Sequence, residues 1–161
     1  MPLVVLVAAL AALGLCASAR AAVDSILIEK GARRMTLYED GRTVKTYRIA
    51  LGFSPVGDKV RQGDGRTPEG VYRISLKNPN SQFHLSLKIS YPDTEDRRAA
   101  ARRGVDPGGD IFIHGTPGRS APYPAGASIP DWTLGCIAVT NEEIEEVFSL
   151  VGVGARVEIR P

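Results

Sequence analysis

The 161-residue chain has few cysteines, few aromatic residues and almost no excess charge of either sign. Its two cysteines exclude a disulfide-rich fold. The 20 basic and 18 acidic residues give a formal charge of +2, which excludes a strongly basic nucleic-acid-binding protein and an acidic disordered tail. Aromatic residues make up only 6%, whereas 17 glycines and 11 prolines favour a turn-rich β protein over a helical bundle. The length fits a single domain.

One long apolar run is present, near the N-terminus. Residues 3–16 read LVVLVAALAALGLC without a charge, and the small residues of ASARAA follow. An apolar run that ends in small residues at alternate positions is typical of a secretory signal peptide. We therefore expect residues 1–21 to be a signal peptide, with cleavage between Ala19 and Ala22, and residues 22–161 to form one exported domain. The domain would then reside in the periplasm or cell-envelope space.

Two other interpretations of the apolar run stay open. The run approaches the roughly 18 apolar residues of a transmembrane helix, so an uncleaved anchor is one alternative. A lipoprotein signal that ends at Cys16 is the other, although Leu15 is bulkier than the residue expected before such a cysteine. Cleavage after Ala21 would leave Cys136 as the one thiol of the mature chain.

Short alternating apolar runs predict a mainly β fold. The predicted strands cover residues 23–30, 34–39, 43–51, 71–76, 83–90, 111–114, 136–139 and 155–160. Asp40 and Gly41 are a hairpin turn signal, because glycine accepts a positive φ. Hairpins dominate the pattern, which predicts a mostly antiparallel β sandwich or barrel.

One or two short helices are expected to pack on these strands. Residues 93–103 have their acidic residues early and their arginines late, and Gly104 follows as a stop signal. A second helix is expected after Thr140, because Thr140 and Glu143 have the spacing of a capping box.

Cys136 and His114 are the residues with the most reactive side chains. His114 ends an apolar run and precedes Gly115, and Cys136 opens another run after Gly135. Adjacent strands would bring the two side chains together, and an imidazole beside a thiol can generate a nucleophilic thiolate. Backbone N–H groups of residues 134–136 could then form an oxyanion hole. A buried inert cysteine and a structural histidine remain the alternatives at this point.

Three blocks resemble, in order, the motifs of the YkuD-type L,D-transpeptidases. They are GDGRTPEGVY at 63–72, IFIHGT at 111–116 and TLGCI at 133–137. The resemblance spans about residues 23–160 and implies an L,D-transpeptidase catalytic domain at 22–161. Its substrates would be peptidoglycan stem peptides, it would need no metal or organic cofactor, and we expect a monomer.

The resemblance also implies roles for individual residues. Cys136 would attack the stem peptide and form a thioester, and His114 would take the thiol proton. The carbonyl of Gly115 would orient the imidazole, while Leu134 and Gly135 would lie at the oxyanion hole. An acceptor amine would then give a crosslink or attach a protein to the wall, and water would give hydrolysis.

The sequence departs from the common motif at two positions. Leu134 replaces a second histidine, and Ala138 replaces an arginine suited to bind a substrate carboxylate. The stretch DWTLGCIAVTN at 131–141 instead resembles a branch in which some members are associated with release of a lipoprotein from peptidoglycan by amide hydrolysis. A peptidoglycan amidase, with a wall-attached lipoprotein as partner, is therefore one alternative. A non-catalytic wall-binding module is a second.

Four further residues are candidates for substrate binding. His84 could replace the missing histidine or point outward, and Tyr91 could line the cleft or pack at a strand end. Trp132 could be a substrate platform or a packing anchor. Asp131 could bind a substrate ammonium or cap a turn. The 63–70 block is expected to be a structural turn beneath the active site.

Overall fold

The computed structural model describes residues 23–118 and 129–161, so the expected signal peptide and its alternatives lie outside the described residues. Its eight strands form one sheet in the order β3-β2-β1-β8-β4-β5-β6-β7. The strands are β1 (Val23–Glu29), β2 (Arg34–Glu39), β3 (Arg42–Arg48), β4 (Gly70–Ser81), β5 (His84–Ile89), β6 (Phe112–His114), β7 (Ile137–Ala138) and β8 (Val151–Arg160). The helices are α1 (Thr94–Arg103) and α2 (Asn141–Leu150). Within the described ranges, no helix has the length and apolar character needed to cross a membrane.

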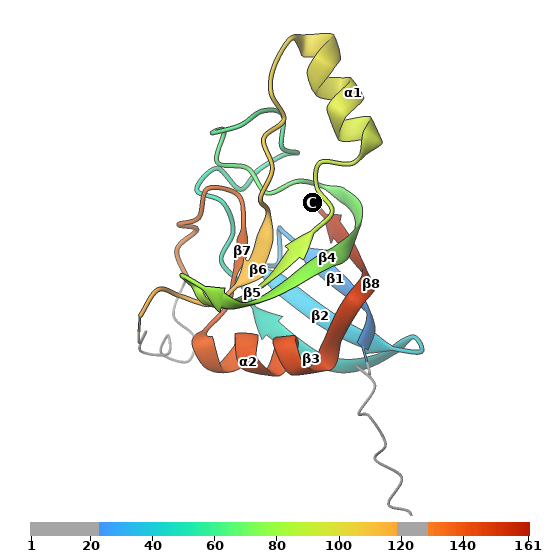
Figure 1. Cartoon of the computed structure of the whole chain (residues 1–161), viewed down its shortest axis with the longest axis vertical. Coiled ribbons are helices and arrows are strands. Elements are labelled where there is room, and N and C mark those ends of the chain that lie inside the picture. The colour runs from blue at the N-terminus through green and yellow to red at the C-terminus, as the bar shows by residue number, and fades with distance from the viewer. Residues whose placement is uncertain (1–22, 119–128) are drawn as a thin grey trace, which may run out of the picture.

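The sheet curls until its two edges are connected (Figure 1). The chain just after β3 crosses to β7, where Ala50 and Ala138 exchange two backbone hydrogen bonds of 2.9 Å. Thr133 continues this contact, because its N–H donates to Leu51 and its carbonyl accepts from Phe53. The prediction of a mainly β, barrel-like domain with two short helices is therefore confirmed.

Local sequence signals explain several of these elements. Asp40 and Gly41 have φ values of 48° and 76°, so the β2–β3 hairpin has the left-handed turn that its sequence predicts. Asp93 and Asp96 form a capping box on α1, and Gly104 ends it with a φ of 65°. Thr140 and Glu143 form the capping box predicted for α2.

Two features of the sheet differ from the sequence prediction. β4 runs on to Ser81 through a polar segment that contains Pro79, where a loop is expected, because its end pairs across the hairpin with His84. Two of the pairings, β1 with β8 and β6 with β7, are parallel, which the hairpin pattern does not indicate, while the other pairings agree with the mostly antiparallel prediction. Parallel partners are distant in sequence, so no turn signal reveals them.

One apolar core fills the inside of the curled sheet. α2 covers one side of it and buries Ile144 and Val147. α1 extends away from the body of the domain in Figure 1, and only Ala100 of this helix is buried. The core and α2 therefore hold β5, β6 and β7 in place, which are the strands that carry the candidate site.

Candidate active site

Cys136 and His114 come from adjacent parallel strands. His114 ends β6, and Cys136 directly precedes β7, whose residues Ile137 and Ala138 pair with Ile113 and His114. Cys136 therefore lies across from Phe112, two positions along the ladder from His114. The backbone N–H of Phe112 donates to Sγ of Cys136 at 3.4 Å.

The imidazole of His114 is held in one orientation. Its Nδ1 lies 2.6 Å from the carbonyl oxygen of Gly115. Because a carbonyl oxygen only accepts, Nδ1 carries the proton and Nε2 keeps its lone pair. The ring of Phe83 stacks at 4.4 Å between centroids, and the Trp132 ring meets His114 edge-on at 5.7 Å. His114 is 3% exposed, so these neighbours leave it little freedom to turn.

Burial keeps both reactive groups neutral at rest. It lowers the pKa of His114 below its ordinary value of 6.5, and the hydrogen bond to Gly115 opposes this effect only in part. Burial also raises the pKa of the Cys136 thiol, and the Asp110 charge raises it further, while the Phe112 N–H and the Lys59 charge lower it. The site thus holds a thiol beside a neutral base rather than a preformed ion pair.

The loop before Cys136 is fixed by backbone geometry and by one hydroxyl. Gly135 has a φ of 132°, and a Cβ at this position would lie 2.6 Å from the carbonyl oxygen of Arg66. The hydroxyl of Thr133 donates to the Cys136 carbonyl at 2.7 Å and accepts from the Gly135 N–H at 3.1 Å. The Gly135 amide is thus engaged, whereas within the described residues the amides of Leu134 and Cys136 donate to no acceptor.

The 63–70 block packs beneath this loop, as expected for a structural turn. Asp64 accepts hydrogen bonds from the N–H groups of Val60, Arg61 and Arg66 and from Nζ of Lys59. Burial raises the pKa of Asp64, but the Lys59 bond and the three amides lower it more, to about 2. This folded turn places the Arg66 carbonyl against Gly135.

Two cavities meet at the candidate nucleophile. The larger, of about 450 Å³, is lined by Lys59, Gln62, Gly63, Phe83, Gly108, Gly109, Asp110, Ile111, His114, Trp132, Thr133, Leu134 and Cys136. The other, here called the amide-lined cavity, has about 350 Å³ and is lined by Asn78, Asn80, Ser81, Gln82, Phe83, Ser86, Asp110, Phe112, His114 and Cys136. Four residues line both: Phe83, Asp110, His114 and Cys136. Both cavities therefore reach the candidate nucleophile.

The structure places one predicted substrate residue, Trp132, and one predicted oxyanion-hole residue, Leu134, at this site. Trp132 lines the larger cavity and contacts the rings of His114 and Phe83, so it combines packing with exposure to the cavity. Leu134 also lines that cavity and is 75% exposed. An apolar side chain therefore stands where the common motif has a polar histidine.

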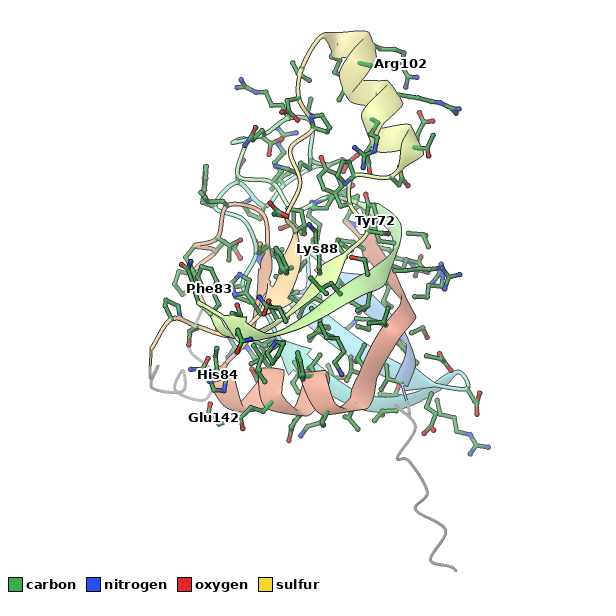
Figure 2. All side chains as sticks on the ribbon, viewed as in Figure 1. Tyr72, Phe83, His84, Lys88, Arg102 and Glu142 are labelled. Atoms are coloured by element: carbon green, nitrogen blue, oxygen red, sulfur yellow. The ribbon has the colours of Figure 1, made fainter. Side chains whose placement is uncertain are left out.

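His84 and Tyr91 lie outside both cavities. Figure 2 shows His84 beside the start of α2, where its Nε2 lies 2.7 Å from Oε1 of Glu145. The hydroxyl of Tyr91 donates to the carbonyl of Pro107 at 2.7 Å, and the Tyr91 residue is 3% exposed. These contacts correspond to the outward and packing alternatives for the two residues.

Asp131 also lies outside both cavities. Its carboxylate accepts from Nε and Nη2 of Arg33 and from the backbone N–H of Leu51. The carboxylate therefore ties the β1–β2 connection to the segment that leads to Cys136. Binding of a substrate ammonium would have to compete with this ion pair.

Sequence reasoning missed three residues that shape the site. Phe83 stacks on His114 from the β4–β5 hairpin, and nothing in its local sequence indicates this contact. Thr133 could have been found from its place in the TLGC motif, since a buried hydroxyl near a tight turn needs partners. Asp110 follows two glycines, and its positive φ of 54° is a conformation that sequence alone does not reveal.

Comparisons with known proteins agree on a family. The family model described as the YkuD L,D-transpeptidase catalytic domain matches residues 24–159. "Putative L,D-transpeptidase YafK" of Escherichia coli (strain K12) is 30% identical over 132 residues, which cover 78% of this chain and 46% of that protein. The chain therefore spans about half the length of this curated relative.

Solved structures give the same result. The helical cell shape determining protein Pgp2 from Campylobacter jejuni is 29% identical with a TM-score of 0.65, over 86% of this chain and 47% of that chain. L,D-transpeptidase 1 of Mycobacterium tuberculosis is 15% identical with a TM-score of 0.53, over 87% of this chain and 62% of that one, and thus shares the fold. The chain belongs to the family of L,D-transpeptidase catalytic domains.

Proposed function

We propose that this protein is a cysteine transpeptidase that modifies peptidoglycan through a thioester on Cys136. One observation carries the proposal. Cys136 lies where two cavities meet, beside a histidine whose Nδ1 is held by a carbonyl and whose Nε2 is left as a base. This is the arrangement that activates a thiol for attack on an amide carbonyl.

Acylation follows from the resting protonation states. Nε2 of His114 takes the proton of the Cys136 thiol as the sulfur attacks the carbonyl carbon of the stem peptide. The C–S bond forms, the C–N bond breaks, and His114 gives the proton to the departing amine. Because both groups begin neutral in a buried site, the charge separation exists only during the reaction.

Backbone amides near the nucleophile can stabilise the oxyanion that develops during attack. Leu134 and Cys136 are the candidates, since their N–H groups donate to no acceptor among the described residues. The Gly135 amide is less suited to this role because it already donates to Thr133. One well-placed donor of this kind contributes about 2.7–4 kcal/mol in the transition state.

The second step decides between transfer and hydrolysis. A stem-peptide amine that enters from one cavity while the acyl group occupies the other would give a crosslink. Water in the same position would release the acyl group, which is the amidase alternative. Two cavities at one thiol support transfer, because they provide separate space for donor and acceptor.

Location and wider role are part of the same proposal. Peptidoglycan lies outside the cytoplasm, so residues 1–21 would direct export and residues 22–161 would act in the cell-envelope space. The similarity to Pgp2, a helical cell shape determining protein, suggests an effect on cell shape. A wall-attached lipoprotein remains a candidate partner if hydrolysis prevails.

The test is incubation of residues 22–161 with tetrapeptide muropeptides, with and without an acceptor amine, followed by mass spectrometry of the products. Crosslinked or amine-capped products are expected, and released peptide alone would establish the hydrolase instead. The Cys136→Ala variant should give neither. Unchanged muropeptides with the wild-type protein would contradict both enzymatic functions and leave the wall-binding module.

A further inference from the structure

We propose that the carboxylate of Asp110 binds the ammonium group of a cationic acceptor amine beside Cys136, and that it thereby favours transfer over hydrolysis. The inference rests on the proposed function, since it concerns the second step of that reaction. It names a residue outside the Cys–His pair and a class of acceptor, a diamine or diamino acid that carries a positive charge.

Asp110 is in direct contact with the nucleophile. Its backbone carbonyl oxygen lies 3.5 Å from Sγ of Cys136 and accepts a hydrogen bond from the resting thiol. Asp110 lines both cavities. Its side chain is 79% exposed, so the carboxylate is accessible to a ligand. In the amide-lined cavity Asp110 therefore lies beside the sulfur that would carry the acyl group.

The backbone at Asp110 is also unusual. Its φ of 54° lies in the left-handed region, which residues other than glycine rarely adopt, although aspartate and asparagine tolerate it better than most. Local strain of this kind clusters at functional sites. At this position it directs the carbonyl of the same residue towards the thiol.

The charge pattern of the amide-lined cavity indicates the class of ligand. The other polar side chains of the amide-lined cavity are neutral at neutral pH: Asn78, Asn80, Ser81, Gln82 and Ser86. Among the described residues that line it, Asp110 is the one Asp, Glu, Lys or Arg. A carboxylate among amides and hydroxyls favours a cation with hydrogen-bond donors, which an ammonium group is, as its resting pair with Lys88 illustrates.

The partner that Asp110 has at rest can be displaced. Nζ of Lys88 lies 2.6 Å from Oδ1 of Asp110, and the Lys88 side chain is 33% exposed. Figure 2 shows Lys88 on β5. Exposed ion pairs contribute little to stability, so an incoming ammonium can share the carboxylate or replace Lys88. Within the described part of the chain, Oδ2 of Asp110 has no partner.

The chemical step balances with these groups. One ammonium of the diamine stays on the Asp110 carboxylate, while its other nitrogen loses one proton to solvent and attacks the thioester carbonyl as a neutral amine. The C–N bond forms and the C–S bond breaks, while the second amine proton passes to Nε2 of His114. His114 then gives that proton to the sulfur of Cys136, which returns the free thiol. Asp110 forms no covalent bond and acts only by holding the acceptor.

The experiment measures the ratio of transfer to hydrolysis for one acyl donor and two acceptors. The donor is a tetrapeptide muropeptide, and the acceptors are 1,3-diaminopropane, which is cationic near neutral pH, and hydroxylamine, which is mostly uncharged there. The Asp110→Asn variant should lower transfer to the diamine about threefold, the scale of one exposed ion pair. Because loss of the Asp110 charge also acts on the Cys136 thiol, absolute rates can change, whereas the ratio of hydroxylamine transfer to hydrolysis should not.

Two further variants serve as controls. Asp106→Asn makes the same charge change on the same loop, where the carboxylate accepts from the Gly108 N–H and lines neither cavity, so it should leave the ratio unchanged. Lys88→Met removes the competing cation and should raise transfer to the diamine. Asparagine tolerates the left-handed backbone, so Asp110→Asn keeps the carbonyl that faces the thiol.

The outcomes separate this inference from the proposed function. If the wild-type protein forms an acyl-enzyme but Asp110→Asn transfers to the diamine as well as wild type, the Asp110 proposal alone is overturned. An equal loss with diamine and hydroxylamine would also overturn it, because the side chain would then act on the thiol and not on the charge of the acceptor. Absence of any acyl-enzyme in the wild-type protein would refute the proposed function and, with it, this step.

Discussion

Asp64→Asn is expected to lower the free energy of unfolding by about 2 kcal/mol at pH 7. The Asp64 side chain is 10% exposed, and four hydrogen-bond donors surround its carboxylate. Burial raises its pKa, but the bonds from Lys59 and three amides lower it more, from 3.8 to about 2. At about 1.36 kcal/mol per pH unit, this difference corresponds to about 2 kcal/mol of stability.

The same pKa fixes how this loss depends on pH. A carboxylate whose pKa is lower in the folded than in the unfolded protein stabilises the fold above the unfolded pKa, near 3.8. That stabilisation disappears as the pH falls from about 4 towards 2. The difference between Asp64→Asn and wild type should therefore be constant from pH 7 to pH 5 and shrink below pH 4. Urea unfolding followed by the fluorescence of the single tryptophan measures it.

Asp106→Asn is the matched control for this measurement. The Asp106 carboxylate accepts one backbone hydrogen bond, from Gly108, in an exposed position. Substitutions at such sites change stability by about 0.5 kcal/mol or less. If the two variants lost the same stability, or if the Asp64→Asn loss persisted unchanged at pH 3, the argument from the charged turn would be refuted.

Three other predictions concern the loop and the reactive pair. Thr133→Val keeps the side-chain shape but leaves the Gly135 N–H and the Cys136 carbonyl without their partner, so thermal unfolding should show a loss of about 2–4 kcal/mol. Gly135→Ala would place a Cβ 2.6 Å from the carbonyl oxygen of Arg66 and thus displace the loop before Cys136. It should reduce the second-order rate of Cys136 acylation, measured by stopped flow, at least tenfold. Leu134→Ala is the control and should not reduce this rate tenfold. Because burial lowers the pKa of His114, the acid limb of the pH profile of acylation should have its midpoint below pH 6.5, and a midpoint above 6.5 would contradict this.

Much of the fold follows from local sequence signals. The β2–β3 hairpin, both capped helices and the mainly β character depend on turn residues, capping residues and alternation, which act over a few residues. The parallel pairing of β6 with β7 is different, because it depends on contacts across the whole domain. Its consequence, the proximity of His114 and Cys136, was expected from the spacing and from the family motifs together.

The site residues show the same difference between local signals and distant contacts. Residues inside or next to the motifs, such as Gly115 and Trp132, lie at the site in the structure. Tyr91 and Asp131 do not line the cavities, since a polar side chain in a branch motif can equally well be satisfied by packing neighbours. Phe83 was missed because its ring reaches His114 from a hairpin that is 31 residues away in sequence.

Mass spectrometry of the intact protein during reaction with a tetrapeptide muropeptide tests the proposed chemistry most directly. The wild-type protein should gain the mass of the acyl donor without its leaving group, and peptide mapping should locate this mass on Cys136. The adduct should be absent from Cys136→Ser and should form about 10²–10⁴-fold more slowly in His114→Gln, the loss expected for a general base. An adduct on any other residue, or wild-type turnover without an acyl-enzyme in quenched single-turnover samples, would contradict the role of Cys136 as the nucleophile.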